Sequence, residues 1–320
     1  MSQDIYVLIE HLQGQVADIS YTMLAAGREL AQGTGGKVVA VLLGDNAKEL
    51  ASDFAADRVL YLDHAALAEF TSDAYQKALA DLIGKDQPRA VLFGNTSIGA
   101  DVASVLSMRL GLPLVSSCRS FTNDGKFVSQ ICGGKIMAEG ELPRPTALVT
   151  VVPGGYQPDL GRAAEAPSIT EVAVPALDGL RVNLSRYIEP ETGDVDISKE
   201  PLLIAVGRGI QNKDNMELAE NLARAIGGVV CASRPVVDQG WLPISRLVGK
   251  SGKQVKPKVY LAMGISGAPE HVESITQSDT IIAINTDPKA PIFNVAKYGI
   301  EGDIFELVET LTEKVNAAKG

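Results

Sequence analysis

A repeated alternation of short apolar runs with longer amphipathic segments limits the fold of this chain more than any other feature. Residues 5–9 are an apolar run of strand length, and Val16–Leu30 then carries apolar side chains at helical spacing. Apolar strands that are joined through helices predict a parallel sheet with both faces covered. The same alternation predicts strands at Lys37–Leu43, Arg58–Leu62 and Ala90–Phe93, and helices at Asn46–Ala55, Ala66–Ile83 and Gly99–Leu110.

After Val115 the helical spacing is lost and turn sequences separate short strands. Residues 123–125 and 133–134 are such turns, so we expect antiparallel strands that extend the edge of the sheet. Before this region, Gly94–Ser97 follows a strand, where a polar cap for the next helix is favoured over a turn that binds a nucleotide phosphate. The expected antiparallel strands are Arg119–Thr122, Lys126–Cys132, Lys135–Glu139 and Thr146–Val152.

An acidic segment at residues 188–200 marks the predicted domain boundary, because it is interrupted by Pro and Gly and has no helical periodicity. We therefore expect an N-terminal α/β domain over residues 1–195 and a doubly wound parallel-sheet domain over residues 196–320. The last helix of the second domain is Ile304–Ala318, which Asp303 is placed to cap. Its other expected elements are strands at Leu202–Val206, Val229–Cys231, Val259–Met263 and Thr280–Ile284, a helix at Asn215–Ile226 and a helical turn at Pro235–Gln239.

Composition excludes several classes of protein. A chain of 320 residues is long enough for two domains, and 39 acidic against 29 basic residues, a net charge of -10, argue against a nucleic-acid partner. No apolar stretch is long enough to span a membrane and the N-terminus has no targeting pattern, so we expect a cytoplasmic protein. The 3 cysteines are scattered without metal-ligand spacing, which predicts neither a disulfide nor a metal site.

The stretch from Val259 to His271 carries the clearest binding signal. Val259–Met263 predicts a buried strand, which ends at Gly264, turns through Ser266-Gly267 and enters a helix that we expect to continue to Ser274. A strand that turns on glycines into a helix presents backbone N–H groups under a partial positive charge, and this arrangement binds phosphate. Taken alone, the pattern is more typical of a tight turn without a ligand.

The surrounding residues resemble the signature of electron-transfer flavoprotein alpha subunits. The resemblance holds in order and spacing from Gly264 to Asp303 and extends more weakly over essentially the whole chain. It implies bound FAD in the second domain, a beta-subunit partner and an N-terminal domain without a cofactor. The residues that carry it are Gly264-Ile265-Ser266-Gly267-Ala268, His271, Ile282-Ala283-Ile284-Asn285, Asp287-Pro288, Ala290-Pro291-Ile292-Phe293, Tyr298-Gly299-Ile300 and Gly302-Asp303, with Arg208-Gly209, Ser233-Arg234 and residues 248–253 upstream.

The resemblance also implies roles for individual residues, none of them catalytic. Arg208 would meet a phosphate, and Asn285 and Asp303 would contact the adenosine half of FAD. The complete cofactor-binding set that it implies is Arg208, Ser233, Arg234, Val248, Gly249, Lys250, Ser251, Gly264, Ser266, Gly267, Ala268, Pro269, Glu270, His271, Asn285, Asp303 and Ile304.

Three of these residues would surround the flavin ring. Arg234 would lie against the isoalloxazine, the Ser251 hydroxyl would bond near N5, and His271 would sit beside the pyrimidine carbonyl. A positive or donor group there stabilises charge on the reduced ring. A unit charge about 4 Å away at an effective dielectric of about 20 is worth roughly 4 kcal/mol, which for one electron is on the order of a hundred millivolts.

The sequence departs from the family pattern at four positions. Lys250 and Glu270 each replace a usual Gln, Ser251 replaces a usual Thr, and Lys297 replaces a usual Asp. The serine keeps the hydroxyl, while the two charges near the cofactor have opposite signs and can offset each other. We therefore expect a flavin potential that differs from that of a housekeeping homologue.

Three classes of function follow. The first is an electron carrier that passes electrons between a flavin dehydrogenase, such as an acyl-CoA dehydrogenase, and an acceptor such as ferredoxin or a quinone oxidoreductase; a bifurcating variant would hold a second FAD mostly in the beta subunit. The second is a nucleotide-dependent dehydrogenase or transhydrogenase that uses the same turn for NAD, although the sequence has no paired acid/base residues. The third is a structural subunit with a decayed site, which the intact glycine turn opposes.

Overall fold

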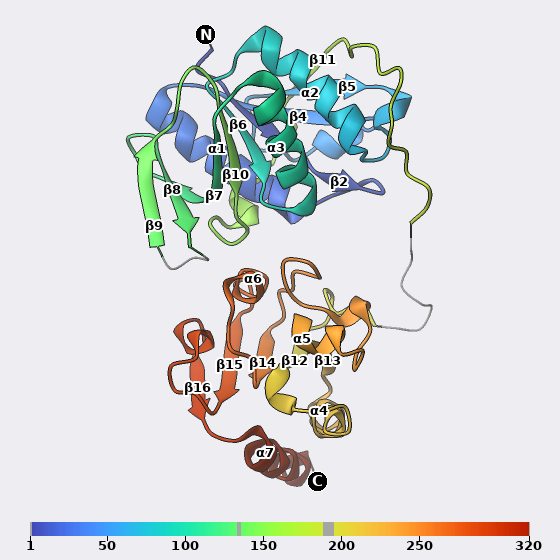
Figure 1. Cartoon of the computed structure of the whole chain (residues 1–320), viewed down its shortest axis with the longest axis vertical. Helices are drawn as coiled ribbons and strands as arrows, with labels where there is room; N and C mark the ends of the chain where they lie inside the picture. The colour runs from blue at the N-terminus through green and yellow to red at the C-terminus, as the bar shows by residue number, and fades with distance from the viewer. Residues whose placement is uncertain (1, 133–135, 188–194, 320) are drawn as a thin grey trace. The chain divides into compact units, whose positions relative to one another are not determined.

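The computed structural model describes residues 2–132, 136–187 and 195–319 (Figure 1). It divides into two compact units, residues 1–187 and residues 188–320, which we call the N-terminal and C-terminal units. The predicted boundary segment begins at this division, and its residues 188–194 lie outside the described part of the chain.

The N-terminal unit is built on a nine-stranded sheet with the order β11-β5-β4-β1-β6-β10-β7-β8-β9. Helix α1 (Asp18–Thr34) packs on one face, whereas α2 (Ser72–Asp86) and α3 (Ser97–Leu110) pack on the other, and each face has its own buried apolar cluster (Figure 1). The strands are β1 Ile5–Leu8, β4 Val38–Gly44, β5 Arg58–Asp63, β6 Ala90–Gly94, β7 Leu114–Phe121, β8 Lys126–Ile131, β9 Ile136–Glu141, β10 Ala147–Val151 and β11 Ser168–Glu171, with a separate hairpin of β2 His11–Leu12 and β3 Gln15–Val16.

The predicted antiparallel edge is confirmed for β7, β8 and β9, but its fourth strand was placed wrongly. Strand β10 lies between β6 and β7 and is parallel to both. All five of its residues are buried, as a strand covered on both faces requires, while most residues of β9 are exposed. The continuous apolar run at 147–151 is therefore the signal of an interior parallel strand.

Two predicted helices of the N-terminal unit are also wrong in part. Asn46–Ala55 forms only a 3₁₀ turn at Lys48–Ala51, because Asp63 and the Tyr61 hydroxyl accept the backbone N–H groups of Asn46 and Ala47. Ala66–Ile83 divides into a 3₁₀ turn at Ala65–Leu67 and α2, and the His64 ring accepts the Ala66 N–H before the first of them. In both places a side chain satisfies a backbone donor outside a helix.

The carboxyl ends of β1 and β6 meet at a buried carboxylate. Glu10 follows β1 and accepts hydrogen bonds from the Thr96 hydroxyl at 2.9 and 3.0 Å and from the Gly94 backbone N–H. The same Thr96 oxygen accepts the Gly99 N–H at 3.0 Å, which confirms the predicted polar cap at the start of α3. Burial raises the pKa of Glu10 from 4.5 to about 7.

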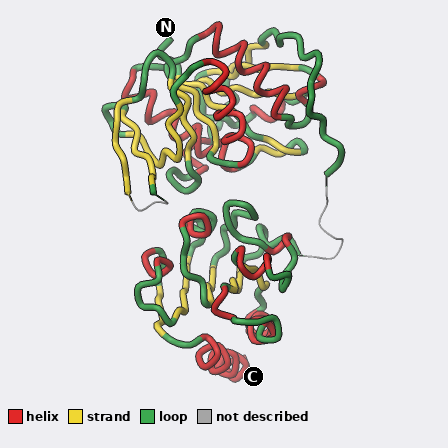
Figure 2. Tube along the Cα trace, viewed as in Figure 1, coloured by secondary structure: helices red, strands yellow, loops and turns green. Residues whose placement is uncertain are grey.

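The C-terminal unit is a five-stranded parallel sheet with the order β13-β12-β14-β15-β16. Helices α4 (Met216–Ile226) and α7 (Ile304–Lys319) contact each other over one apolar cluster, which also includes Val236 of α5 (Arg234–Asp238). The other face is covered mainly by loops and α6 (Pro269–Val272), as Figure 2 shows. The strands are β12 Leu202–Val206, β13 Val229–Ala232, β14 Val259–Met263, β15 Thr280–Asn285 and β16 Tyr298–Glu301.

The predictions for this unit fail at two places. Strand β16 was not predicted, because all four of its residues are exposed and give no apolar run. The helix expected to continue from the glycine turn to Ser274 is only the single turn α6, Pro269–Val272. Asp303 caps α7 as predicted, since its carboxylate accepts the Phe305 N–H at 2.9 Å.

Candidate cofactor site

The predicted binding segments meet at one edge of the C-terminal sheet. Arg208 follows β12, Ser233 and Arg234 follow β13, and the glycine turn at 264–268 follows β14. Asn285 ends β15 and Asp303 follows β16. Because all five strands are parallel, their carboxyl ends lie along the same edge, which is where ligands bind in open α/β sheets.

The glycine turn depends on backbone contacts that leave no room for side chains. Gly264 and Gly267 have φ values of 61° and 87°, in the left-handed region that glycine adopts without strain. A Cβ on Gly267 would lie 2.3 Å from the Ile292 nitrogen, and one on Gly209 would lie 2.7 Å from the Cα of Gly264. The glycines therefore let the backbone of this turn pack closely against its neighbours. Ser266 and Ala268 of the same turn are exposed.

A loop at residues 248–253 contacts the segment that follows this turn. The Lys250 N–H donates to the Glu270 carbonyl at 2.9 Å, and Gly249 has a φ of 148°. This loop brings Ser251 to Arg234, whose Nη1 donates to the serine Oγ at 3.1 Å. Arg234 and Ser251, two of the three residues that the resemblance places around the flavin ring, are thus in direct contact.

Arg234 is held by a carboxylate that the sequence analysis missed. Its Nε donates to Asp238 Oδ1 at 2.6 Å, one helical turn further along α5. Both side chains are more than half exposed, so the pair orients the guanidinium more than it stabilises the fold. The four-residue spacing of opposite charges was the available sequence signal.

His271 differs from its expected role because both ring nitrogens are already bonded inside the protein. Nδ1 is 3.1 Å from the Val248 carbonyl oxygen and Nε2 is 2.9 Å from the Tyr260 hydroxyl. The imidazole is buried, and burial lowers its pKa from 6.5 to about 4. A cation at this position, which the sequence analysis considered, is therefore disfavoured.

The remaining predicted residues divide into exposed groups and residues bonded within the unit. Asn285 donates from Nδ2 to the Ile265 carbonyl at 2.9 Å and accepts the Asp287 N–H at 2.9 Å, so it ties the glycine turn to the end of β15. Ser233 is buried and its N–H donates to the Val206 carbonyl. The side chain of Ile304 belongs to the core, so only its backbone can face a ligand. The exposed members are Arg208, Lys250, Pro269 and Glu270.

Two family models cover most of the chain. The electron transfer flavoprotein domain matches residues 5–177, and the electron transfer flavoprotein FAD-binding domain matches residues 196–276. The chain belongs to the electron transfer flavoprotein alpha-subunit family. The predicted family and FAD as its cofactor are therefore confirmed.

Curated relatives match over nearly their whole length. The electron transfer flavoprotein subunit alpha of Bacillus subtilis is 32% identical, over 98% of this chain and 98% of the relative. The acryloyl-CoA reductase electron transfer subunit beta of Anaerotignum propionicum is 33% identical, over 99% of this chain and 96% of the relative. Protein FixB of Azotobacter vinelandii is 34% identical, over 99% and 92% respectively.

The residues at this edge of the flavoprotein fit a dinucleotide in charge and shape. Gly267 lets the turn pack directly against the chain at Ile292, since a Cβ there would lie 2.3 Å from the Ile292 nitrogen, and this packing fixes the backbone of the turn. Arg208, Arg234 and Lys250 supply exposed cations on three separate segments that follow β12 and β13. Because α6 is a single turn, the phosphate would be held by N–H groups of the turn and by these cations rather than by a long helix dipole.

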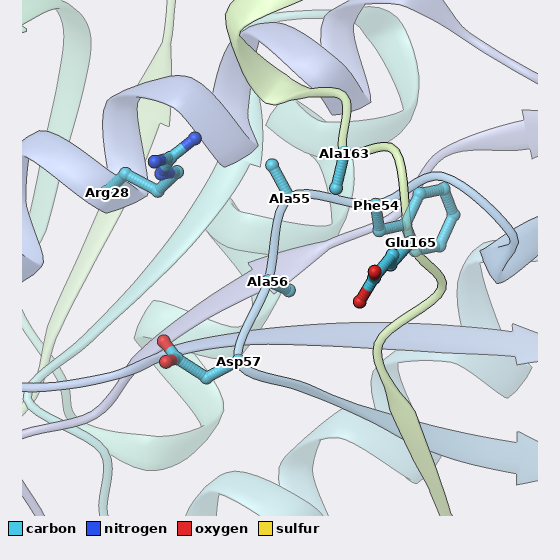
Figure 3. Close-up of a pocket in the computed structure, with 7 residues that line it drawn as sticks. All are labelled: Arg28, Phe54, Ala55, Ala56, Asp57, Ala163 and Glu165. Atoms are coloured by element: carbon cyan, nitrogen blue, oxygen red, sulfur yellow. The ribbon is translucent and has the colours of Figure 1, made fainter.

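A pocket in the N-terminal unit lies at the amino end of β5, not at the carboxyl ends of the strands. It is lined by Arg28 of α1, by Asp57 immediately before β5 and by Glu165 (Figure 3). The Asp57 carboxylate already accepts the Val38 N–H at 2.8 Å, and ligands of α/β sheets bind at the carboxyl ends of the strands. None of the predicted cofactor residues lines this pocket.

Proposed function

We propose that this chain works with a beta subunit as an electron carrier between a flavin dehydrogenase and a downstream acceptor. The Arg234–Ser251 contact beside the glycine turn carries the proposal, because it places a cation and a hydroxyl together without any acid/base pair for substrate chemistry. FAD, when bound, supplies the electron storage, and the residues of the site orient it and adjust the free energy of its reduction. The described residues contain no group of His, Cys, Asp or Glu that could hold a metal.

The names of the relatives support a partner of the acyl-CoA dehydrogenase type. One relative is the electron transfer subunit of an acryloyl-CoA reductase, so we propose a flavin enzyme acting on acyl-CoA substrates as one redox partner. A ferredoxin or a quinone oxidoreductase is the proposed acceptor. No helix among the described residues has the length and apolarity needed to cross a lipid bilayer.

The test is to co-express this chain with its beta subunit, purify the complex and count the flavin. One FAD per heterodimer, reduced by a dehydrogenase and not by NADH, is the expected result for a carrier. Two FAD per heterodimer with reduction by NADH would indicate the bifurcating variant instead. A colourless complex that does not bind added FAD would contradict the proposal, and steady NADH oxidation without a partner would favour the dehydrogenase alternative.

The departures Lys250 and Glu270 should shift the flavin potential in opposite directions. Replacing Lys250 with Gln removes an exposed cation and should lower the potential, whereas Glu270→Gln should raise it. Exposed charges contribute at most about 1 kcal/mol, so each shift should be about 10–40 mV for a one-electron couple. Potentiometric titration measures both, with Lys256→Gln as a control for net charge; no shift beyond that control would remove this role.

A further inference from the structure

A buried chain of hydrogen bonds lies behind the candidate cofactor site. It joins Cys231 of β13, Tyr260 of β14, His271 of α6 and the Val248 carbonyl of the 248–253 loop. The thiol and the phenol are fully buried and the imidazole is 7% exposed. Of these residues, Val248 and His271 belong to the predicted cofactor set, whereas the sequence analysis assigned no role to Tyr260.

The chemistry of the groups fixes the direction of this chain. A carbonyl oxygen only accepts hydrogen bonds, so the proton of the neutral imidazole must be on Nδ1, which donates to Val248. Nε2 then carries the lone pair and accepts the Tyr260 hydroxyl proton at 2.9 Å. The phenol also forms a hydrogen-bond contact with the Cys231 thiol.

The surroundings favour this neutral form of the ring. Strands β13 and β14 present Cys231 and Tyr260 to the site, while the nearest charged residues along the two loops, Lys250 and Glu270, are exposed. Burial is the largest influence on the pKa of His271 and lowers it to about 4. A protonated ring would place an isolated cation in the interior, which is strongly unfavourable.

We propose that Tyr260 is a positioning residue: its hydroxyl holds His271 as the neutral, Nδ1-protonated tautomer with the Nε2 lone pair occupied. His271 then acts on the cofactor through its fixed position and dipole, not as a cation or a proton donor. The effect of His271 on the cofactor rests on the proposed function, whereas the tautomer of His271 is a property of the protein alone.

The first experiment reads the tautomer without the cofactor. The chain with its beta subunit is labelled with ¹⁵N-histidine, and the His271 signals are identified by their loss in His271→Asn. We expect a protonated Nδ1, an unprotonated Nε2 and no titration of His271 near the ordinary value of 6.5. A protonated Nε2, or a titration near that value, would overturn the proposal.

The second experiment removes the hydroxyl with Tyr260→Phe. The Nε2 lone pair loses its donor and becomes more basic, so the pKa of His271 should rise above about 4, while burial still holds it below 6.5. Cys231→Ala is the matched control, because it shortens the chain but keeps the Tyr260–His271 bond, and it should change the His271 signals much less. Equal spectra for wild type and Tyr260→Phe would exclude a positioning role.

The flavin potential provides the functional readout. In the FAD-loaded wild type, His271 should add no inflection to the pH dependence of the potential between about pH 5 and 8. In Tyr260→Phe a new inflection should appear at the raised pKa, with a higher potential below it, because the protonated ring stabilises the reduced cofactor. Identical curves would overturn the link to the cofactor, whereas a failure to load FAD bears on the proposed function and leaves the tautomer result intact.

Discussion

Replacing Gly267 with alanine is expected to weaken FAD binding by the C-terminal unit strongly. Two effects add at this position. Alanine with a φ of 87° costs about 1–2 kcal/mol relative to glycine, and its Cβ would lie 2.3 Å from the Ile292 backbone nitrogen. The neighbouring segment must therefore shift, at a further cost of about 1–3 kcal/mol. Since 1.4 kcal/mol is about tenfold in affinity, the combined cost of about 2–5 kcal/mol corresponds to a loss of roughly 30-fold or more.

Gly227→Ala is the matched control for this prediction. Gly227 has a φ of 75° in the same unit, but no atom lies within 4 Å of its added Cβ. It should show the backbone cost alone, about 1–2 kcal/mol in the free energy of unfolding, with nearly unchanged affinity for FAD. Chemical denaturation and flavin-fluorescence titration measure the two quantities. Equal FAD affinities in the two variants would show that the close approach at Ile292 has no role.

The sequence was sufficient to predict which segments meet at one edge of the C-terminal sheet. The apolar runs that became β12, β14 and β15 have no exposed residue, and parallel strands place their following residues on one edge. Arg234 and Ser251 came from separate segments, yet the structure joins them at 3.1 Å. Here local patterns and the family resemblance pointed to the same place.

The contacts behind that edge could not be predicted in the same way. Tyr260 of β14 meets Cys231 of β13 on one face of the sheet, with β12 between the two strands, and α6 brings His271 to the same place. This depends on register, which apolar periodicity does not specify. The Asn46–Ala55 helix failed for a related reason, since Tyr61 and Asp63 of the following strand bind its first N–H groups. Tertiary partners, which a local pattern omits, decided both cases.

Replacing Glu10 with glutamine should stabilise the N-terminal unit at alkaline pH. The pKa of Glu10 is raised from 4.5 to about 7, mainly because the carboxylate is buried. The folded state therefore binds this proton more tightly than the unfolded state does. The tighter binding of this proton to Glu10 contributes roughly 3 kcal/mol to the free energy of unfolding. This contribution is fully present below about pH 4.5 and is lost as the pH rises through about 7.

The position of Glu10 gives this cost a structural meaning. Its carboxylate lies at the carboxyl ends of β1 and β6 and accepts from Thr96 and Gly94, beside the first turn of α3. A nucleotide phosphate would occupy this point in a binding sheet of this type. The chain's own carboxylate fills it, which supports the proposal that the N-terminal unit holds no cofactor.

Calorimetry measures the stability of the full chain with its beta subunit at pH values from 5 to 9. Fluorescence of Trp241, the 1 tryptophan of the chain, identifies the transition of the C-terminal unit, so the other unit of this chain can be followed separately. Glu10→Gln keeps an oxygen that accepts from Thr96 and cannot ionise. Its stability should exceed that of wild type by about 2–3 kcal/mol near pH 9 and converge with it near pH 5. Glu49→Gln, at an exposed site in the same unit, should leave the dependence of stability on pH unchanged. If the curves of stability against pH for Glu10→Gln and wild type run parallel, the Glu10 carboxylate does not change its protonation on folding.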